Sequence, residues 1–223
     1  MLMFRSVAPV LLSLSAPLAL FAQGTIPPNS PQATPVKDAS LLKPPAGAKV
    51  AVVEYEDLEC PACAHAFPIV HSTASHYHIP IEENDFQIPN HVWSHDAAIF
   101  AHYLKAKVSP ELSEEFRREV FAMQLRIASK DDLHNFEQSF MSQHGKQIPF
   151  VVDPTGEYDR EVNTTTNQGS RLGLTHTPTI FVVTQNHWYE VPDVSNLDQA
   201  IEQANTEAAH ASPATVHRTT AHK

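Results

Sequence analysis

The sequence predicts an α/β domain into which a block of helices is inserted. Three observations support this fold class. A short apolar, β-branched run at residues 50–55 has the composition of a buried strand. Residues 94–146 show only helical periodicity, and strand-type runs return at residues 179–191, before a last helix at residues 197–209. Strands on both sides of the helical block indicate one domain, at about residues 49–209, that carries an insert.

The first part of this domain is expected to run strand, helix, strand. Residues 50–55 form the first strand, and residues 64–77, which follow the two cysteines, form a helix. Residues 79–88 are expected to contain the second strand.

The helical insert shows clear start signals. Residues 96–107 are one candidate helix, and Ser109 is expected to cap a second helix with Pro110 in its first position. Ser129 with Asp132 resembles a capping box that starts a third helix. The apolar stripes, which we interpret as packing faces and not as a cofactor site, are Leu112, Phe116, Val120, Met123 and Ile127, and then Leu133, Phe136 and Phe140, until Gly145.

The last part is expected to run helix, strand, strand, helix. Residues 157–172 predict a weaker helix, because three consecutive threonines have low helix propensity. Gly173 is expected to end this helix. Strands at residues 179–184 and 187–191 follow, and then the helix at residues 197–209.

The two ends of the chain differ from this domain. Residues 1–22 combine a positive start with an apolar stretch and small residues before Gln23, which predicts a cleaved secretory signal peptide. Residues 23–48 are rich in proline and are expected to form an extended, flexible leader. Residues 210–223 are expected to be a disordered tail. The signal predicts a periplasmic or secreted protein.

The composition argues against nucleic acid and anionic membranes as partners. The formal net charge of −10 gives no electrostatic reason to expect nucleic acid or an anionic membrane surface. The 42% hydrophobic content is ample for a buried core, so the cysteines are not needed to hold a small fold together.

Both cysteines of the chain lie in one short motif, Cys60-Pro61-Ala62-Cys63. This motif follows a strand and opens a helix, with Pro61 in the first helical position. Free backbone N–H groups and the positive end of the helix dipole then face the Cys60 sulfur and stabilise its thiolate. Cys63 lies one turn later and is expected to be more buried. We therefore expect Cys60 to exchange with substrates and Cys63 to resolve the mixed disulfide.

The motif also has two alternative interpretations, a static disulfide and a zinc site. A static disulfide closing so short a loop would constrain the unfolded chain very little. A zinc site would need further ligands, and no second cysteine pair exists. The nearest histidines have spacings that fit no common structural site, so no metal is expected; they are His71, His76 and His78, or His91 and His95.

Two motifs together resemble a known family. Val52-Val53-Glu54-Tyr55 precedes the Cys60–Cys63 motif, and Thr177-Pro178-Thr179 lies far downstream, before an apolar run. In this order, and with a helical insert between them, they resemble the thioredoxin superfamily, and within it the DsbA-like thiol:disulfide oxidoreductases. The resemblance covers roughly residues 49–209 and implies a thioredoxin-like fold with an inserted helical domain.

The resemblance also implies roles for single residues. Cys60 would be the nucleophile and Cys63 the resolving thiol. Pro178 would follow a cis peptide bond and face the cysteines, and with Thr177 it would offer a backbone edge to a substrate strand. Glu54 matches a buried acidic residue that moves protons to and from the resolving thiol. An ordinary charge at the end of a strand is the alternative for Glu54, and the sequence leaves both open.

Some positions depart from the family pattern. Many strong oxidants of the family carry a histidine between the cysteines, where this chain has Pro61 and Ala62. His176, before Thr177, stands where a small residue is frequent. It either contacts substrate or tunes Cys60, or it is a solvent-facing loop residue.

Acidic residues surround the motif, namely Glu56, Asp57 and Glu59. Their charges disfavour a thiolate on Cys60, which would lower the oxidising power of the pair. Alternatively, they are solvated beside a helix terminus whose effect dominates. We expect Cys60 to be acidified, but less than in the strongest oxidants.

The sequence therefore predicts an oxidase that introduces disulfide bonds into unfolded or partly folded, thiol-containing secreted proteins through Cys60 and Cys63. The redox-active disulfide would need no bound metal or organic cofactor, and the protein is expected to be a monomer. Reoxidation by a membrane partner of the DsbB or vitamin K epoxide reductase type is implied by the resemblance. The alternatives are a reductase or isomerase on the same scaffold, a thiol-based metal-binding module, and a peptide-binding chaperone without redox turnover.

Overall fold

The computed structural model describes residues 36–210. The expected signal peptide, residues 23–35 of the leader and residues 211–223 of the tail lie outside the described residues. Within the described part of the chain, no helix is both long enough and apolar enough to cross a bilayer.

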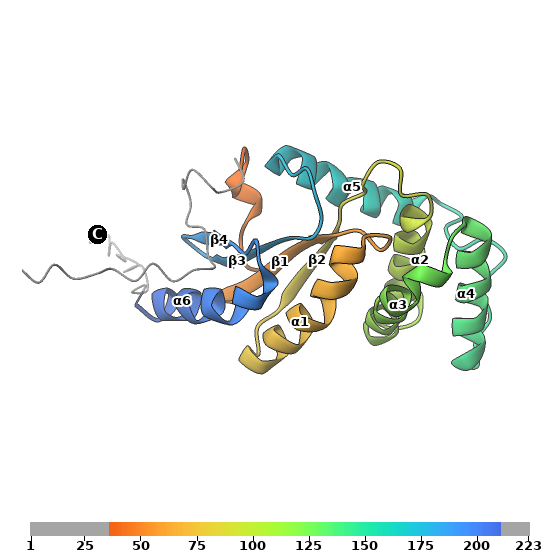
Figure 1. Cartoon of the computed structure of the whole chain (residues 1–223), viewed down its shortest axis with the longest axis horizontal. Coiled ribbons are helices and arrows are strands. Elements are labelled where there is room, and N and C mark those ends of the chain that lie inside the picture. The colour runs from red at the N-terminus through yellow and green to blue at the C-terminus, as the bar shows by residue number, and fades with distance from the viewer. Residues whose placement is uncertain (1–35, 211–223) are drawn as a thin grey trace, which may run out of the picture.

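A four-stranded mixed sheet forms the centre of the domain (Figure 1). Its strands stand in the order β2-β1-β3-β4. β1 is parallel to β2 and antiparallel to β3, and β3 is antiparallel to β4. The strands are β1 (Val50–Glu56), β2 (Ile81–Asp85), β3 (Thr179–Thr184) and β4 (Trp188–Glu190).

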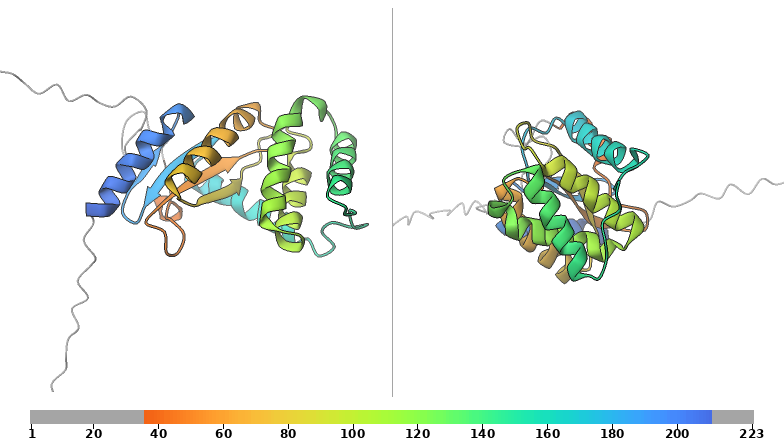
Figure 2. Two further views of the ribbon diagram at one scale, coloured as in Figure 1. Left: turned by 90° about the horizontal axis from the view of Figure 1, so that it is seen from below. Right: turned by 90° about the vertical axis from the view of Figure 1, so that its right-hand side faces the viewer.

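Helices cover both faces of this sheet and extend it at one end. α1 and α6 lie on one face and α5 on the other, while α2, α3 and α4 gather beyond the sheet (Figures 1 and 2). The helices are α1 (Pro61–Tyr77), α2 (Ser94–Lys107), α3 (Pro110–Met123), α4 (Lys130–Gln143), α5 (Glu157–Leu172) and α6 (Leu197–His210). This is a thioredoxin-like α/β fold with a helical insertion, as the sequence predicts.

The alternation of side chains along β1 determines which residues face α1, the helix that carries the cysteines. Val52 packs in the core between the sheet, α1 and α6, whereas Val53 and Tyr55 pack in the core on the α5 side. Successive side chains of a strand point to opposite faces. Glu54 and Glu56 therefore point to the same face as Val52, toward α1.

The insert is joined to α1 by aromatic packing. Phe67 of α1 lies 5.1 Å from Phe121 of α3, measured between ring centroids, and Phe100 of α2 lies 4.9 Å from Phe116. Cys63 belongs to this same buried cluster. The helical insert thus packs directly against the helix that carries both cysteines.

Local signals predict the helix starts better than the helix ends. The hydroxyl of Ser109 accepts a hydrogen bond from the N–H of Leu112, and that of Ser129 accepts one from the N–H of Asp132. α3, however, ends at Met123, because the chain tightens there into a 3-10 turn, η2 (Gln124–Arg126). Ile127 is buried, as the stripe predicts, but from outside the helix.

One part of the expected leader packs on the domain, so the expectation of a flexible segment is wrong for residues 36–48. Leu42 is only 1% exposed and joins the core on the α5 side. The N–H of Lys37 donates to the carbonyl of Leu172 at 2.9 Å. Prolines prevent regular structure here, but they do not prevent single apolar side chains from packing.

Close packing of α5 on the sheet gives a test of this architecture. A Cβ atom added at Gly169 would lie 2.5 Å from the ring of Phe86 and 3.2 Å from the ring of Tyr55. We expect Gly169→Ala to lower the free energy of unfolding by about 1–3 kcal/mol, the usual cost of overpacking. This loss should outweigh the roughly 1 kcal/mol by which a helix favours Ala over Gly.

Denaturant unfolding measures this change, with Ser170→Ala, at an exposed position of the same helix, as the control. The control should stay within about 0.5 kcal/mol of the wild type. A Gly169→Ala protein as stable as the wild type would contradict the packing described.

Candidate active site

Cys60 is the residue from which α1 starts. It has extended backbone angles (φ −84°, ψ 119°), and Pro61 follows as the first helical residue. Because proline has no N–H group, the first free N–H groups of the helix are those of Ala62 and Cys63, and both point at the Cys60 sulfur. Pro61 and Ala62 are themselves exposed.

Several hydrogen-bond donors converge on the Cys60 sulfur. The thiol of Cys63 lowers the pKa of Cys60 most, and the side chain of Thr177, whose buried hydroxyl has no partner elsewhere, lowers it further. In its protonated form, the Cys60 thiol itself donates to the carbonyl oxygen of Thr177 at 3.4 Å. Burial opposes the charge, but the hydrogen bonds prevail and lower the pKa of Cys60 to about 5. Cys60 is therefore a thiolate at neutral pH.

Cys63 has the opposite environment. Its side chain is 0% exposed, whereas Cys60 is 7% exposed, and both are free thiols in the structure. Burial raises the pKa of Cys63 far above its usual range, and the charges of Cys60 and Glu56 raise it further. Only Cys60 is thus a ready nucleophile, while Cys63 stays protonated.

A groove beside Cys60 is formed around the Thr177–Pro178 peptide bond, which is cis. The groove has a volume of about 470 Å³, and its lining includes Ile180 of β3. Ala62 and the exposed His176 stand at its rim. A short extended peptide could lie here, against the backbone edge of Thr177.

The acidic residues around the motif are hydrogen-bond acceptors in the fold, so the interpretation that they are merely solvated is wrong. The carboxylate of the buried Asp57 accepts from the N–H groups of Glu59 and Ile88 at 2.8 and 2.9 Å. The carboxylate of Glu59 accepts from the N–H groups of Trp93 and Ser94, at the start of α2. Both carboxylates are thus held in place by backbone N–H donors of the fold.

Glu56 is bound by a buried cation that the sequence analysis missed. Arg117 of α3 donates to Glu56 at 2.7 Å and to Asp85 of β2 at 3.0 Å. Burial raises the pKa of Glu56 to about 7 despite Arg117, whereas Arg117 and His102 overcome burial and lower the pKa of Asp85 to about 2. Arg117 could have been found from its position in α3, where it shares the buried face of Phe116.

Glu54 lies on the face of the sheet that α1 covers and is 0% exposed, which excludes the alternative of an ordinary charge at the end of a strand. Neither of its carboxyl oxygens has a hydrogen-bond partner. Burial raises its pKa well above the usual range, and the charges of Glu56 and Glu83 add to this effect. Its burial therefore favours the protonated form of the carboxyl group.

Gln124, a second residue that the sequence analysis missed, links the insert to the active-site loop. Its side-chain amide donates to the carbonyl of Leu58 at 2.7 Å and to that of Cys60 at 3.1 Å. The contact fixes the backbone immediately before α1. No local sequence signal reveals it, because it joins residues more than 60 positions apart.

Comparison with known proteins identifies the family of this chain. The thioredoxin family model matches residues 45–203, which include the cysteine motif and the cis-proline loop. The chain belongs to the thioredoxin family. No curated protein matches the sequence significantly.

Solved structures place this thioredoxin-family chain among DsbA-like folds. It resembles a point variant of α-DsbA1 from Wolbachia pipientis (TM-score 0.53, 17% identity, covering 76% of this chain and 92% of that one). It also resembles DsbA2 of Pseudomonas aeruginosa (TM-score 0.54, 16% identity, covering 73% of this chain and 92% of that one). A third similar structure is ScsC of Proteus mirabilis (TM-score 0.55, 15% identity, covering 74% of this chain and 71% of that one). At these identities the likeness establishes the shared fold: a thioredoxin domain with a helical insertion.

Three of the five histidines considered as metal ligands, His71, His91 and His95, pair with carboxylates. His91 contacts Asp57 at 2.9 Å, and His95 contacts Asp159 at 2.8 Å. Among residues 36–210, no group of three or more His, Cys, Asp or Glu side chains is arranged to hold a metal ion.

The hydrogen bonds at Cys60 predict its titration. In the reduced protein, the thiolate absorbance and the alkylation rate of Cys60 should fall as the pH drops through about 5, the pKa of its thiol. Because the folded pKa is lowered, this stabilisation of the reduced fold is complete above the unfolded pKa of about 8.5 and is lost as the pH falls toward 5.

Thr177→Val tests the contribution of the hydroxyl. We expect the pKa of Cys60 to rise by roughly one, since a hydrogen bond to a charged group is worth about 1.5 kcal/mol. Thr175→Val, at an exposed position two residues away, is the matched control and should leave the titration unchanged. A wild-type pKa near 8.5 would contradict the described site.

Proposed function

We propose that this protein is a thiol:disulfide oxidoreductase that introduces disulfide bonds into unfolded or partly folded secreted proteins. The observation that carries the proposal is the contrast between the two sulfurs. Cys60 is held as a thiolate beside the cis-proline groove, and Cys63 is buried and protonated behind it.

The exchange follows from this contrast. A substrate thiolate attacks the Cys60 sulfur of the oxidised enzyme, the Cys60–Cys63 bond breaks, and Cys63 leaves as a thiolate that takes up a proton. A second substrate thiolate then attacks the substrate sulfur of the mixed disulfide, and Cys60 leaves as a thiolate. Two electrons pass from the substrate to the cysteine pair, and the substrate gains one disulfide.

The lowered pKa of Cys60 favours this direction. A stabilised thiolate is a better leaving group, and it stabilises the reduced form of the pair, which makes the disulfide more oxidising. In our proposal the pair is reoxidised by a membrane protein of the DsbB or vitamin K epoxide reductase type. It needs no metal or organic cofactor, and the protein acts as a monomer without nucleic acid.

The proposed location is the periplasm. The signal-like character of residues 1–22 supports export, and one structural neighbour is a periplasmic thioredoxin-like protein from Salmonella enterica serovar Typhimurium. An oxidising compartment is also where disulfide formation is useful.

Oxidative folding of reduced, unfolded ribonuclease tests the proposal. The oxidised wild-type protein should transfer its disulfide and speed the recovery of ribonuclease activity. Cys60→Ser should abolish transfer, because it removes the nucleophile. Cys63→Ser should accumulate a mixed disulfide with the substrate, because the resolving thiol is missing.

Other outcomes would decide against the proposal. Folding assistance that survives Cys60→Ser would indicate a peptide-binding chaperone. Stoichiometric metal in the reduced protein, with little exchange, would indicate a metal-binding module. Reduction of insulin disulfides without net oxidation of ribonuclease would indicate a reductase.

A further inference from the structure

The turn that leads into α1 touches both sulfurs of the site. It begins at Asp57, whose backbone N–H binds the Cys63 sulfur, and it ends at Cys60. The N–H of Cys60 donates to the carbonyl of Asp57 at 2.9 Å, which closes the turn. A displacement of residues 57–60 would therefore move the Cys60 sulfur relative to the helix N–H groups that stabilise its thiolate.

Gln124 binds this turn from the helical insert. Its side-chain amide nitrogen carries two hydrogens, and it donates to the carbonyl of Leu58 at 2.7 Å and to that of Cys60 at 3.1 Å. The carbonyl of Cys60 also accepts from the N–H of Ala64 at 3.1 Å, in the first turn of α1. One side chain thus joins the turn to the start of the helix.

The carbonyl of Leu58 depends on this contact. Leu58 is 1% exposed, and no other donor among residues 36–210 binds its carbonyl. A buried carbonyl without a partner costs free energy, so a turn that loses the Gln124 amide must rearrange or admit water to regain a donor. Gln124 therefore restrains the turn and does not merely lie beside it.

Gln124 is itself held in place by the core. It opens η2, the 3-10 turn in which its carbonyl accepts from the N–H of Ile127 at 3.1 Å. Ile127 is 5% exposed and belongs to the same buried cluster as Leu58, Cys60 and Cys63. The packing of the insert thus fixes the residue that binds the turn.

A second contact ties the turn to another element of the insert. The carboxylate of Glu59 accepts from the N–H groups of Trp93 and Ser94 at 2.8 and 3.2 Å, at the start of α2. The turn is therefore bound both by η2 and by the start of α2.

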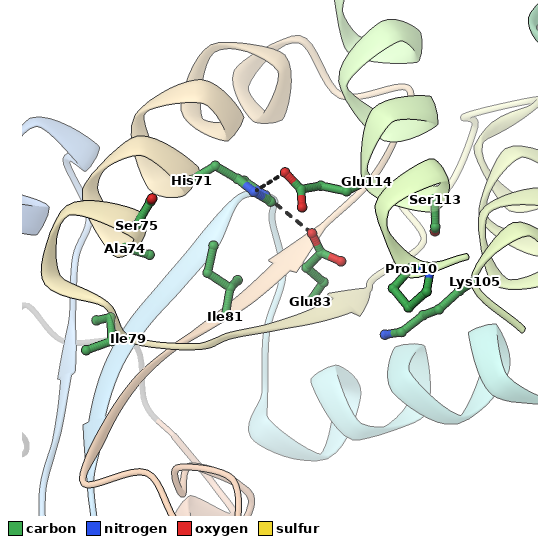
Figure 3. Close-up of a pocket in the computed structure, with 10 residues that line it drawn as sticks. All are labelled: His71, Ala74, Ser75, Ile79, Ile81, Glu83, Lys105, Pro110, Ser113 and Glu114. Carbon is green, nitrogen blue, oxygen red and sulfur yellow. Dashed lines mark ion pairs between the residues drawn. The ribbon is translucent and has the colours of Figure 1, made fainter. Parts of the chain in front are cut away.

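The insert also meets α1 at a second, more open place. Figure 3 shows His71 of α1 between Glu83 of β2 and Glu114 of α3, at a pocket of about 390 Å³. The imidazole nitrogens lie 3.3 Å from Glu83 and 3.4 Å from Glu114, whose side chain is 48% exposed. His71 follows Cys63 by about two turns of the helix, so this junction is an insert contact that does not reach the turn.

The geometry points to Gln124 as a positioning residue for the exchange, which holds residues 57–60 so that the Cys60 sulfur stays at the N–H groups of Ala62 and Cys63. This role rests on the proposed function and deepens it, because the thiolate that Gln124 positions is the group that exchanges with substrates. The helical insert thereby acts on Cys60 through the backbone of the turn.

Titration of the Cys60 thiolate in the reduced protein tests this role in Gln124→Met, which keeps the length of the side chain but has no donor. The pKa of Cys60 is about 5 in the wild type. We expect it to rise by roughly one, the effect of weakening one hydrogen bond to a charged sulfur. The thiolate fraction at pH 5 should then fall about fivefold, and the reduction potential should fall by about 30 mV, the equivalent of a tenfold change.

Gln124→Glu is a second, isosteric variant. A carboxylate has nearly the size and shape of the amide, but it accepts where the amide donates, and it adds a negative charge. We expect it to raise the pKa of Cys60 more than Gln124→Met does.

Two controls separate this role from other effects. Gln138→Met makes the same change at an exposed glutamine of α4. Glu114→Gln weakens the junction at the pocket, which also joins the insert to α1. Both proteins should titrate as the wild type does.

The proposal is overturned if Cys60 titrates in Gln124→Met as in the wild type, even where denaturant unfolding shows a loss of stability, because the contact is then purely structural. It is also overturned if only Gln124→Glu raises the pKa of Cys60, because the added charge alone explains that result. If Gln124→Met does not fold, Gln124→Asn, whose amide is one methylene shorter, decides by the same titration.

The titration needs no substrate, so its outcome is distinct from a failure of the proposed function. A shifted titration in Gln124→Met, with no transfer of disulfides to ribonuclease by the wild type, would refute the proposed function and leave Gln124 as the residue that positions Cys60.

Discussion

The chemistry of this site depends on the stabilisation of one negative charge, on the sulfur of Cys60. Starting α1 at Cys60 directs the N–H groups of Ala62 and Cys63 at that sulfur, and the cis-proline loop brings the Thr177 side chain close enough to lower the pKa of the thiol further. The lowered pKa of Cys60 depends on all of these groups being in place together. The end of β1, the first turn of α1 and the loop before β3 are therefore held together at a single atom.

The second constraint is the placement of charge under the active-site helix. Burying carboxyl groups costs free energy, and a hydrophobic face would pack as well or better. The domain instead buries Glu54 and Glu56 and brings Arg117 from the insert to meet them. This arrangement ties the insert to the sheet through the Arg117–Glu56 ion pair.

The sequence predicted what is encoded locally. The strand of residues 50–55, the caps at Ser109 and Ser129 and the position of Cys60 at a helix start all depend on neighbours within a few residues, and the structure has each of them. The resemblance to thioredoxins, based on two motifs and the insert, gave the correct fold.

The features that sequence reasoning missed depend on partners far apart in the chain. The burial of Leu42 could not be predicted from its proline-rich surroundings, because the residues that it packs against lie in distant parts of the chain. The role of the acidic residues beside the motif could not be predicted, because the backbone N–H groups that donate to them are known only from the structure. Gln124 and Arg117 bind partners more than 60 residues away in the chain. The position of Arg117 in α3 predicts its burial, but no periodicity or spacing reveals the partners of either residue.

The reduction potential of the Cys60–Cys63 pair, equilibrated against glutathione buffers, tests the central claim most directly. A hydrogen-bonded thiolate stabilises the reduced form, so the potential should lie well above the roughly −270 mV of thioredoxin, toward the roughly −120 mV of DsbA. A potential at or below about −270 mV would contradict the claim that the Cys60 environment makes this protein a donor of disulfides.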